Sequence, residues 1–454
     1  MPKFKKSIIT GLLISSSLVL SLVSPLHAKV YDFTEDNKLT LLQDARAAVE
    51  LKLDLVRHAK NHIHIMTYYW DKKGYPIELI RELKKAHERG VDVRIMTTYI
   101  PSLTMDFWGK SKKELFAGYD KNNSSAVLAY MRMAPGNNES ITNNIHEKVF
   151  LVDGEKAILG GRNISDNDFR AKDLEVMLEG EIVNQVQEHF KKMFSFLIDL
   201  KIGNDCKKKK VDCLAKFNKL KFADEDKKFF PEQPHYAGGA RARILTNEIL
   251  FDQHQNHYSG DARFTVKDDI IDTIININFT KMRGYNYFII PTERYKNYLE
   301  KNLAEGKSID IITNSITTAA AISNKGYLYG LPEMHNLVGL GLNLHQWLGT
   351  KQEEGKDKLF YLHEKVMLFD DDHGIIGSHN FGAGSTSVSS EISVEFFSRP
   401  IVQVLNEVFD SEKNSSELTK EATLPLLESE IHDNLKMIRL LHAAIIRNIV
   451  KELY

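Results

Sequence analysis

Residues 145–153 read IHEKVFLVD, and residues 362–370 read LHEKVMLFD. The same pattern thus returns at an offset of 217 residues. The correspondence extends beyond both stretches, since Gly160, Gly161 and Asn163 match Gly377, Ser378 and Asn380 at the same offset. Asp173 falls one residue out of register with Glu391. Two homologous units in one chain are therefore predicted.

The sequence around each stretch alternates between patterns typical of helices and of strands. In the first half, helix, strand, helix and strand are expected over residues 45–60, 62–70, 77–89 and 91–99. In the second half, strand, helix and strand are expected over residues 287–291, 293–304 and 308–313. This alternation predicts the α/β class, with a mixed, mostly parallel sheet flanked by helices in each unit. We expect the two units to pack as a pseudo-two-fold dimer.

Composition limits the class of protein. A chain of 454 residues with 43% hydrophobic and 27% charged residues, 11 prolines and 26 glycines is not disordered, collagen-like or a polytopic membrane protein. Its two cysteines, Cys206 and Cys213, are too few for a disulfide scaffold or a four-thiolate zinc site. A large soluble core is therefore expected.

Residues 1–28 have the pattern of a secretory signal peptide, in which three lysines precede an apolar run and Ala28 precedes the cleavage site. An uncleaved anchor is the alternative, favoured by the large Leu26, although the run is short for a bilayer span. Either reading predicts an exported protein, periplasmic or secreted, with the membrane surface as a partner. Removing the signal leaves 57 of 60 basic residues against 61 acidic ones, a net charge of −4. Nucleic acid is not an expected partner of such a chain.

Residues 201–235 are expected to form a lysine-rich linker or insertion between the two units. Ten lysines and five acids lie within residues 200–230. Charge runs of this kind are usually solvated surface, and the alternative is a basic strip that attracts anionic lipid headgroups. A disulfide between Cys206 and Cys213 would suit an exported protein and is held as a hypothesis.

The remaining boundaries follow from the repeat and the linker. The first domain is expected over residues 29–200, the second over 236–412, and a helical segment over 413–454. Apolar residues recur at helical spacing in this last segment, which predicts a helix docked on the protein's own core. A membrane-surface helix is the alternative.

The repeated stretch carries the side chains needed for transfer at phosphorus. Residues two apart in a strand point to the same side, so His146 lies beside Lys148 and His363 beside Lys365. Two such units facing each other would place two imidazoles on opposite sides of one pocket. One imidazole can attack phosphorus while the other protonates the departing alkoxide and later deprotonates the incoming alcohol or water. A phosphohistidine intermediate is therefore predicted.

Further polar residues complete the expected site. The donors to the non-bridging phosphate oxygens are expected to be Lys148, Lys365, Asn163 and Asn380. They supply the charge stabilisation for which many phosphoryl-transfer enzymes use a metal, so no metal or other cofactor is expected. Asp173 and Glu391 are expected to accept a hydrogen bond from the far ring nitrogen of each histidine and to fix its tautomer.

The two copies of H-x-K-x4-D, residues 146–153 and 363–370, resemble the paired signature of the phospholipase D superfamily. The resemblance spans residues 45–410 and is greatest to bacterial cardiolipin synthases, on segments 67–70, 89–94, 160–164, 173–176, 313–315 and 377–381. It implies two phospholipase D-like domains that act as one monomer on phospholipids. It also implies that His146 is the nucleophile and His363 the acid/base, roles that the pseudo-symmetry leaves interchangeable. Asp153 and Asp370 would then belong to the catalytic signature.

Three departures from the cardiolipin synthase pattern concern recognition rather than chemistry. Gly382–Ser385 replaces an arginine, Thr97 and Thr98 replace acids, and Ile290–Glu293 replaces an aromatic proline turn.

The expected reaction is phosphatidyl transfer to an alcohol, together with hydrolysis to phosphatidic acid. A phospholipase D that only hydrolyses and an exported nuclease of the same superfamily are the alternatives. A non-catalytic lipid-binding protein is opposed by the presence of the motif in both halves.

Overall fold

The structure is a computed structural model and describes residues 30–71, 74–98, 126–131, 144–199, 237–250, 265–319, 324–351, 358–387 and 389–443. The expected signal peptide, the lysine-rich segment with both cysteines, and the end of the C-terminal segment lie outside these ranges. Among the helices within them, none combines the length and apolar character needed to cross a bilayer.

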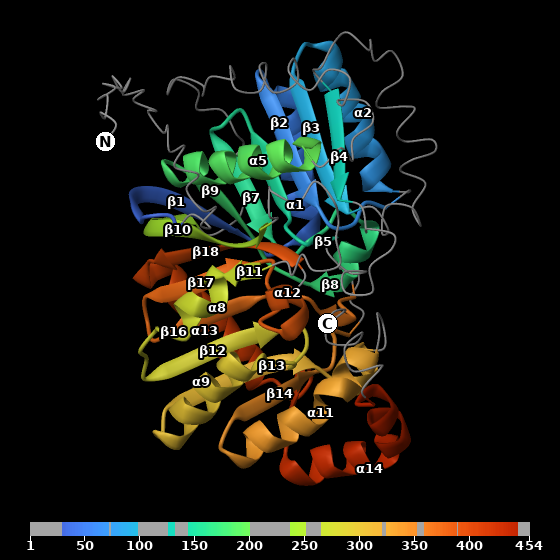
Figure 1. The fold of residues 1–454 in the computed structure, drawn as a ribbon, viewed down its shortest axis with the longest axis vertical. Coiled ribbons are helices and arrows are strands. Elements are labelled where there is room, and N and C mark those ends of the chain that lie inside the picture. The colour runs from blue at the N-terminus through green and yellow to red at the C-terminus, as the bar shows by residue number, and fades with distance from the viewer. Residues whose placement is uncertain are drawn as a thin grey trace, which may run out of the picture.

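The strands of both halves form one continuous hydrogen-bonded series (Figure 1). In the first half its order is β4 (Ala126–Met131), β3 (Asp92–Thr98), β2 (His62–Thr67), β6 (Val149–Val152), β7 (Lys156–Gly160), β9 (Glu175–Glu179) and β1 (Thr34–Leu42). In the second half it is β10 (Ala237–Leu250), β18 (Ser389–Phe397), β17 (His373–Gly377), β16 (Val366–Phe369), β12 (Lys281–Asn286), β13 (Ser308–Asn314), β14 (Asn343–Trp347) and β19 (Thr419–Glu421). The antiparallel pairing of β1 with β10 joins the two series. The mixed α/β class is therefore confirmed.

Within these two series, parallel pairing is confined to one end of each half, where β2, β3 and β4 correspond to β12, β13 and β14. The other pairings within these two series are antiparallel, so the sheet contains fewer parallel pairs than the sequence led us to expect. The reason is the repeated stretch, which forms a hairpin. The turn after Val152 begins with Asp153 and Gly154, both at positive φ (54° and 74°), and is too short for the crossover that parallel neighbours require.

Helices follow the strands in both halves. They are α1 (Ala45–His58), α2 (Tyr75–Glu88) and α5 (Ile182–Asp199) in the first half, and α8 (Asp269–Ile274), α9 (Glu293–Ala304), α10 (Ile316–Ala319), α11 (Asn324–Gly339), α12 (Ala383–Ser387), α13 (Arg399–Lys413) and α14 (Leu424–Leu441) in the second. Three short strands complete the site region: β5 (Asn144–Ile145), β8 (Ala171–Lys172) and β15 (Tyr361–Leu362). A further strand, β11 (Thr265–Asp268), pairs with β10.

The buried core is shared between the halves. One apolar cluster contains residues of both, including Phe190 on α5 and Phe409 on α13. Two further clusters lie within the first and the second half. The C-terminal helix α14 packs on α11 and buries Leu427, Ile438 and Leu441, as the docked-helix interpretation predicts. A shared core of this kind fixes the two units rigidly against each other.

Asp153 and Asp370 hold the start of the neighbouring strand. Their carboxylates accept hydrogen bonds at 2.7–3.0 Å from backbone N–H groups of Lys60, Asn61 and His62 for Asp153, and of Thr280 and Lys281 for Asp370. Each aspartate directly follows a four-residue strand, β6 or β16, whereas the histidine lies three residues before the first residue of that strand. These contacts give both aspartates a role in the fold, and their place in the catalytic signature stays a prediction.

Asp153→Ala should lower the free energy of unfolding by about 2 kcal/mol, because three backbone N–H groups lose their acceptor. Asp153→Asn keeps one amide oxygen and should cost about half as much. Urea denaturation measures both, with Asp371→Ala in the exposed turn of the second half as the control. A loss of turnover in Asp153→Ala with unchanged stability would show that this carboxylate acts in catalysis.

Candidate active site

His146 and His363 each follow a two-residue strand that is paired with the other half of the chain. The strand β5 before His146 pairs parallel with β18, and β15 before His363 pairs parallel with β8. The backbone N–H of His146 donates to the carbonyl of Ser390 at 3.0 Å, and that of His363 to the carbonyl of Lys172 at 2.7 Å. Each histidine is therefore held against the backbone of the opposite half.

The residues next to these carbonyls supply the carboxylates that orient the histidines. Nδ1 of His146 lies 2.8 Å from Oε1 of Glu391, and Nδ1 of His363 lies 2.7 Å from Oδ2 of Asp173. Both carboxylates are fully buried, whereas the two imidazole side chains keep 15% and 13% exposure. With Nδ1 occupied, Nε2 is the ring nitrogen that remains for chemistry. The sequence predicted the two carboxylates but not which histidine each one contacts.

A polar side chain at the end of a parallel strand fixes the residue before each histidine. On β3, Oγ1 of Thr98 donates to the carbonyl of Ile145 at 3.0 Å and accepts from its N–H at 2.9 Å. On β13, the amide of Asn314 makes the same two contacts with Leu362, at 2.8 and 2.9 Å. At equivalent positions, a threonine and an asparagine thus both bind the backbone of the residue that precedes the histidine.

Lys148 and Lys365 turn back toward the histidine of their own half. Each ammonium donates to that histidine's backbone carbonyl. Each also lies over a tyrosine ring, Lys148 at 5.6 Å from the centroid of Tyr68 and Lys365 at 5.5 Å from that of Tyr287. The charge of each lysine lowers the pKa of both histidines. The structure therefore brings together both lysines and both imidazoles.

Burial determines the charge state of the site. It is the largest cause that lowers the pKa of His146 and of His363 to about 4, and the adjacent carboxylates offset it only in part. Burial alone would raise the pKa of both carboxyl groups. The neighbouring histidine and lysine instead lower the pKa of Glu391 to about 2 and also lower that of Asp173. At neutral pH both imidazoles are neutral and both carboxylates are ionised.

Asn163 and Asn380 lie on equivalent loops after β7 and β17. Both have a buried amide oxygen without a hydrogen-bond partner within the described part of the chain. The backbone fixes their positions, since the carbonyl of Asn163 accepts from the Tyr75 hydroxyl at 3.1 Å and the N–H of Asn380 donates to Oγ of Ser385 at 3.0 Å. Two amide oxygens left without a partner in the same way fit a site that takes a polar ligand.

A buried ion cluster makes the two halves chemically unequal. Lys52 lies 2.6 Å from Glu175, Arg162 lies 3.6 Å from the same carboxylate, and all three side chains are buried. In the second half, Ser393 takes the place of Glu175 in the strand pairing. His379 takes the place of Arg162 at the offset of 217. Sequence reasoning missed this cluster, although the arginine within a repeated glycine-asparagine motif was an available signal.

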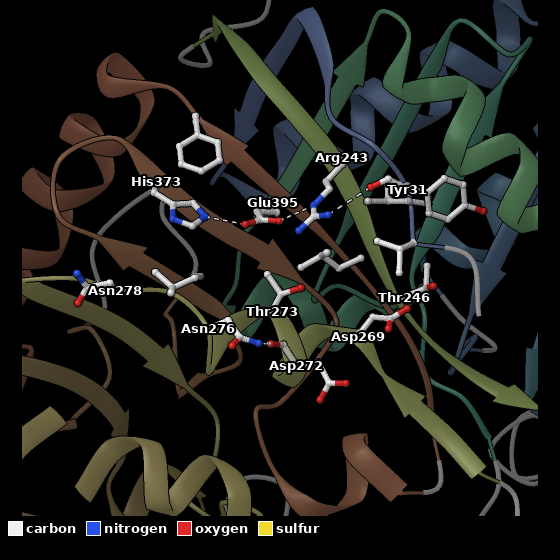
Figure 2. Close-up of a pocket in the computed structure, with 15 residues that line it drawn as sticks. Tyr31, Arg243, Thr246, Asp269, Asp272, Thr273, Asn276, Asn278, His373 and Glu395 are labelled. Atoms are coloured by element: carbon white, nitrogen blue, oxygen red, sulfur yellow. Dashed lines mark hydrogen bonds and ion pairs between the residues drawn. The ribbon is translucent and has the colours of Figure 1, made fainter. Parts of the chain in front are cut away.

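A separate cavity of about 550 Å³ lies elsewhere in the structure (Figure 2). Its lining includes a hydrogen-bonded row in which Glu395 lies 2.9 Å from His373 and accepts from Arg243 at 2.7 Å. None of the site residues predicted from the sequence lines this cavity. The candidate active site is therefore defined by the convergence of the two motifs.

Comparison with known proteins identifies relatives along most of the chain. A family model described as "Cardiolipin synthase, PLD-like domain" matches residues 53–194 and 275–413, so each matched segment contains one of the two histidines. An uncharacterized protein of Helicobacter pylori is 25% identical over 398 residues, which cover 78% of this chain and 75% of that protein. Cardiolipin synthase 1 of Staphylococcus epidermidis is 21% identical over 396 residues, which cover 85% of this chain and 69% of that protein.

Among solved structures, the phosphatidylserine synthase of Haemophilus influenzae is similar in fold. It aligns with a TM-score of 0.64 at 14% sequence identity, over 93% of this chain and 97% of that one. The likeness extends over both halves and supports a common architecture.

Stability should fall with pH in the window set by the two histidines. Their pKa is about 4 in the folded protein and about 6.5 in an unfolded chain. The unfolded state binds more protons between these values, so stability present above pH 6.5 is lost as the pH falls toward 4. Urea denaturation at pH 7 and pH 5 measures the loss of unfolding free energy between these pH values. That loss should be smaller in the double variant His146→Asn/His363→Asn than in the wild-type protein. An equal loss would mean that other groups, such as the buried His64, carry the effect.

Thr98→Val should lower kcat for bis(p-nitrophenyl) phosphate about tenfold with less change in KM, because small misplacement of a reacting group is costly. The substitution removes both hydrogen bonds to Ile145 and keeps the side-chain shape. Thr98→Ser retains the hydroxyl and should retain activity. An unchanged kcat in Thr98→Val would show that the contact with Ile145 does not position His146.

Proposed function

The chain belongs to the family of cardiolipin synthase, phospholipase D-like domains, and on this premise we propose that it transfers phosphatidyl groups on phospholipids through a phosphohistidine. One observation carries the proposal: the two halves exchange carboxylates, so that His146 and His363 each have Nδ1 occupied and Nε2 available. Such a reciprocal pair supplies one nucleophile and one acid/base for a single phosphodiester.

In the first step, Nε2 of His146 attacks phosphorus and forms an N–P bond while the bond from phosphorus to the departing alcohol oxygen breaks. His363, protonated at Nε2, gives its proton to that oxygen. Both histidines are neutral in the empty site, and the anionic phosphodiester raises the pKa of His363 when it binds. Asp173 stabilises the imidazolium that forms.

In the second step, the neutral His363 removes the proton from an incoming hydroxyl. The hydroxyl oxygen attacks phosphorus, the N–P bond breaks, and His146 returns to its starting state. If the hydroxyl belongs to an alcohol such as glycerol or phosphatidylglycerol, a new phospholipid is formed. If it belongs to water, the product is phosphatidic acid.

Charge stabilisation comes from the side chains around the two histidines. Lys148 and Lys365 provide positive charge at the phosphate, and the amides of Asn163 and Asn380 complete the ring of polar groups. Within the described residues, no group of three or more His, Cys, Asp and Glu side chains is arranged to hold a metal. We expect activity to persist in excess chelator, whereas full loss that a divalent ion restores would contradict this part of the proposal.

Lipid product analysis tests the reaction. Purified protein is incubated with vesicles that contain phosphatidylglycerol or phosphatidylethanolamine, with and without glycerol, and the products are separated. We expect transfer products and phosphatidic acid together. Transfer needs a site that excludes water, and the small side chains of Gly382–Ser385 leave the site more open to water, which favours hydrolysis. Phosphatidic acid alone would leave a hydrolase. Cleavage of nucleic acid without any lipid product would leave a nuclease.

Single variants test the assignment of roles. His146→Asn should abolish the phosphoenzyme that can be trapped with a radiolabelled headgroup donor, because no nucleophile remains. His363→Asn should lower kcat by about 10³-fold and still allow a labelled intermediate with a good leaving group. The reverse pattern would exchange the two roles, which the pseudo-symmetry of the sequence leaves open.

A further inference from the structure

Two tyrosines occupy the same place in the two halves. The strand registers align His62–Trp70 with residues 281–289, because Ile63 faces Val152 as Met282 faces Phe369. Within these nine aligned positions, Tyr68 and Tyr287 form the one identical pair. The surrounding positions diverged in charge, size and shape, so the strand itself does not require tyrosine there.

The two rings also make the same contacts. Tyr68 meets the imidazole of His146 edge to face, with ring centroids 5.2 Å apart and an interplanar angle of 64°. Tyr287 meets that of His363 at 5.2 Å and 76°. Each ring lies in addition beneath the ammonium group of the lysine in its own half, at 5.6 and 5.5 Å. The duplication thus provides an internal replicate of one arrangement.

We propose that Tyr68 and Tyr287 are positioning residues, whose rings hold the histidine and the lysine of each half in their working geometry. The proposal rests on the proposed function and adds two residues to its machinery. A tyrosine ring packed against the imidazole limits rotation of the imidazole about its Cβ–Cγ bond. The hydrogen bond to Glu391 or Asp173 alone would restrict that rotation less. The electron-rich face attracts the ammonium and keeps it directed at the phosphate site.

The aromatic ring rather than the hydroxyl carries this role. Burial raises the pKa of Tyr68, so its hydroxyl stays protonated and does not compete with the histidines as a base. The contacts to histidine and lysine are both made by the ring. Phenylalanine should therefore replace either tyrosine, whereas leucine should not.

The rings also contribute to the low proton affinity of the histidines. The charged groups that act most on His146 are Glu391, Lys148 and Lys365, and those that act most on His363 are Asp173 and the same two lysines. Leucine substitution leaves all of these in place and lets water reach the imidazole. Since burial is the largest cause of the lowered pKa, that pKa should rise when the ring is lost.

The experiment compares Tyr68→Phe, Tyr68→Leu, Tyr287→Phe and Tyr287→Leu. Steady-state kinetics on bis(p-nitrophenyl) phosphate should show about tenfold lower kcat for each leucine variant and kcat within about twofold of wild type for each phenylalanine variant. The acid limb of the pH–rate profile should move to higher pH in the leucine variants. Histidine ring signals in NMR titrations should move the same way, and this readout does not depend on any enzymatic activity.

Tyr298→Leu is the matched control. Tyr298 is a buried tyrosine in the same apolar cluster as Tyr287, and its hydroxyl donates to the backbone carbonyl of Ile277 at 3.0 Å, away from the histidines. Its loss should lower the melting temperature without moving the acid limb. Should Tyr287→Leu fail to fold, the half-buried Tyr68 carries the test.

Two outcomes would overturn the proposal. Leucine variants with wild-type kcat and unshifted histidine titrations would show that the rings only fill space. Phenylalanine variants as impaired as the leucine variants would assign the role to the hydroxyl. Failure of the lipid assay in the wild-type protein, with the histidine titrations shifted as expected, would instead count against the proposed function alone.

Discussion

The site depends on two carboxylates, each of which comes from one half of the chain and accepts a hydrogen bond from the histidine of the other half. Glu391 lies 245 residues from His146, and Asp173 lies 190 residues from His363, yet both pairs are within hydrogen-bond distance. A histidine without its carboxylate would have no fixed tautomer and no partner for the imidazolium. The pairing of β5 with β18 and of β8 with β15 holds these contacts in place. This pairing depends in turn on the sheet and the apolar core that the two halves share.

The two halves reach the same geometry with different residues. Thr98 and Asn314 fix the backbone before each histidine with unlike side chains. Beside the carboxylates, a side chain at Gly161 would lie 2.2 Å from Asp173, whereas Ser378 at the equivalent position donates to Glu391. Duplication therefore preserved positions and contacts more strictly than residue types.

Part of this arrangement could be predicted from the sequence. The offset of the two HEK stretches led to the duplicated α/β fold and to the polar residues His146, Lys148, Asn163 and Asp173 with their counterparts, because local patterns record which side of a strand a residue faces. The exchange of carboxylates could not be read from it, since a contact across two hundred residues leaves no local pattern. The hairpin made the sheet less parallel than expected. Asp153 and Asp370 recur with the histidines in the sequence, and the contacts that the structure shows for their carboxylates are with backbone N–H groups, which the family signature does not predict.

The order in which the strands are synthesised has its own consequence. The ribosome completes the first half, including His146 and Lys148, long before Glu391 on β18 emerges. A nascent or truncated chain therefore carries a histidine that has no carboxylate to orient it. The geometry that orients His146 can therefore form only after nearly the whole chain has been made and its halves have docked.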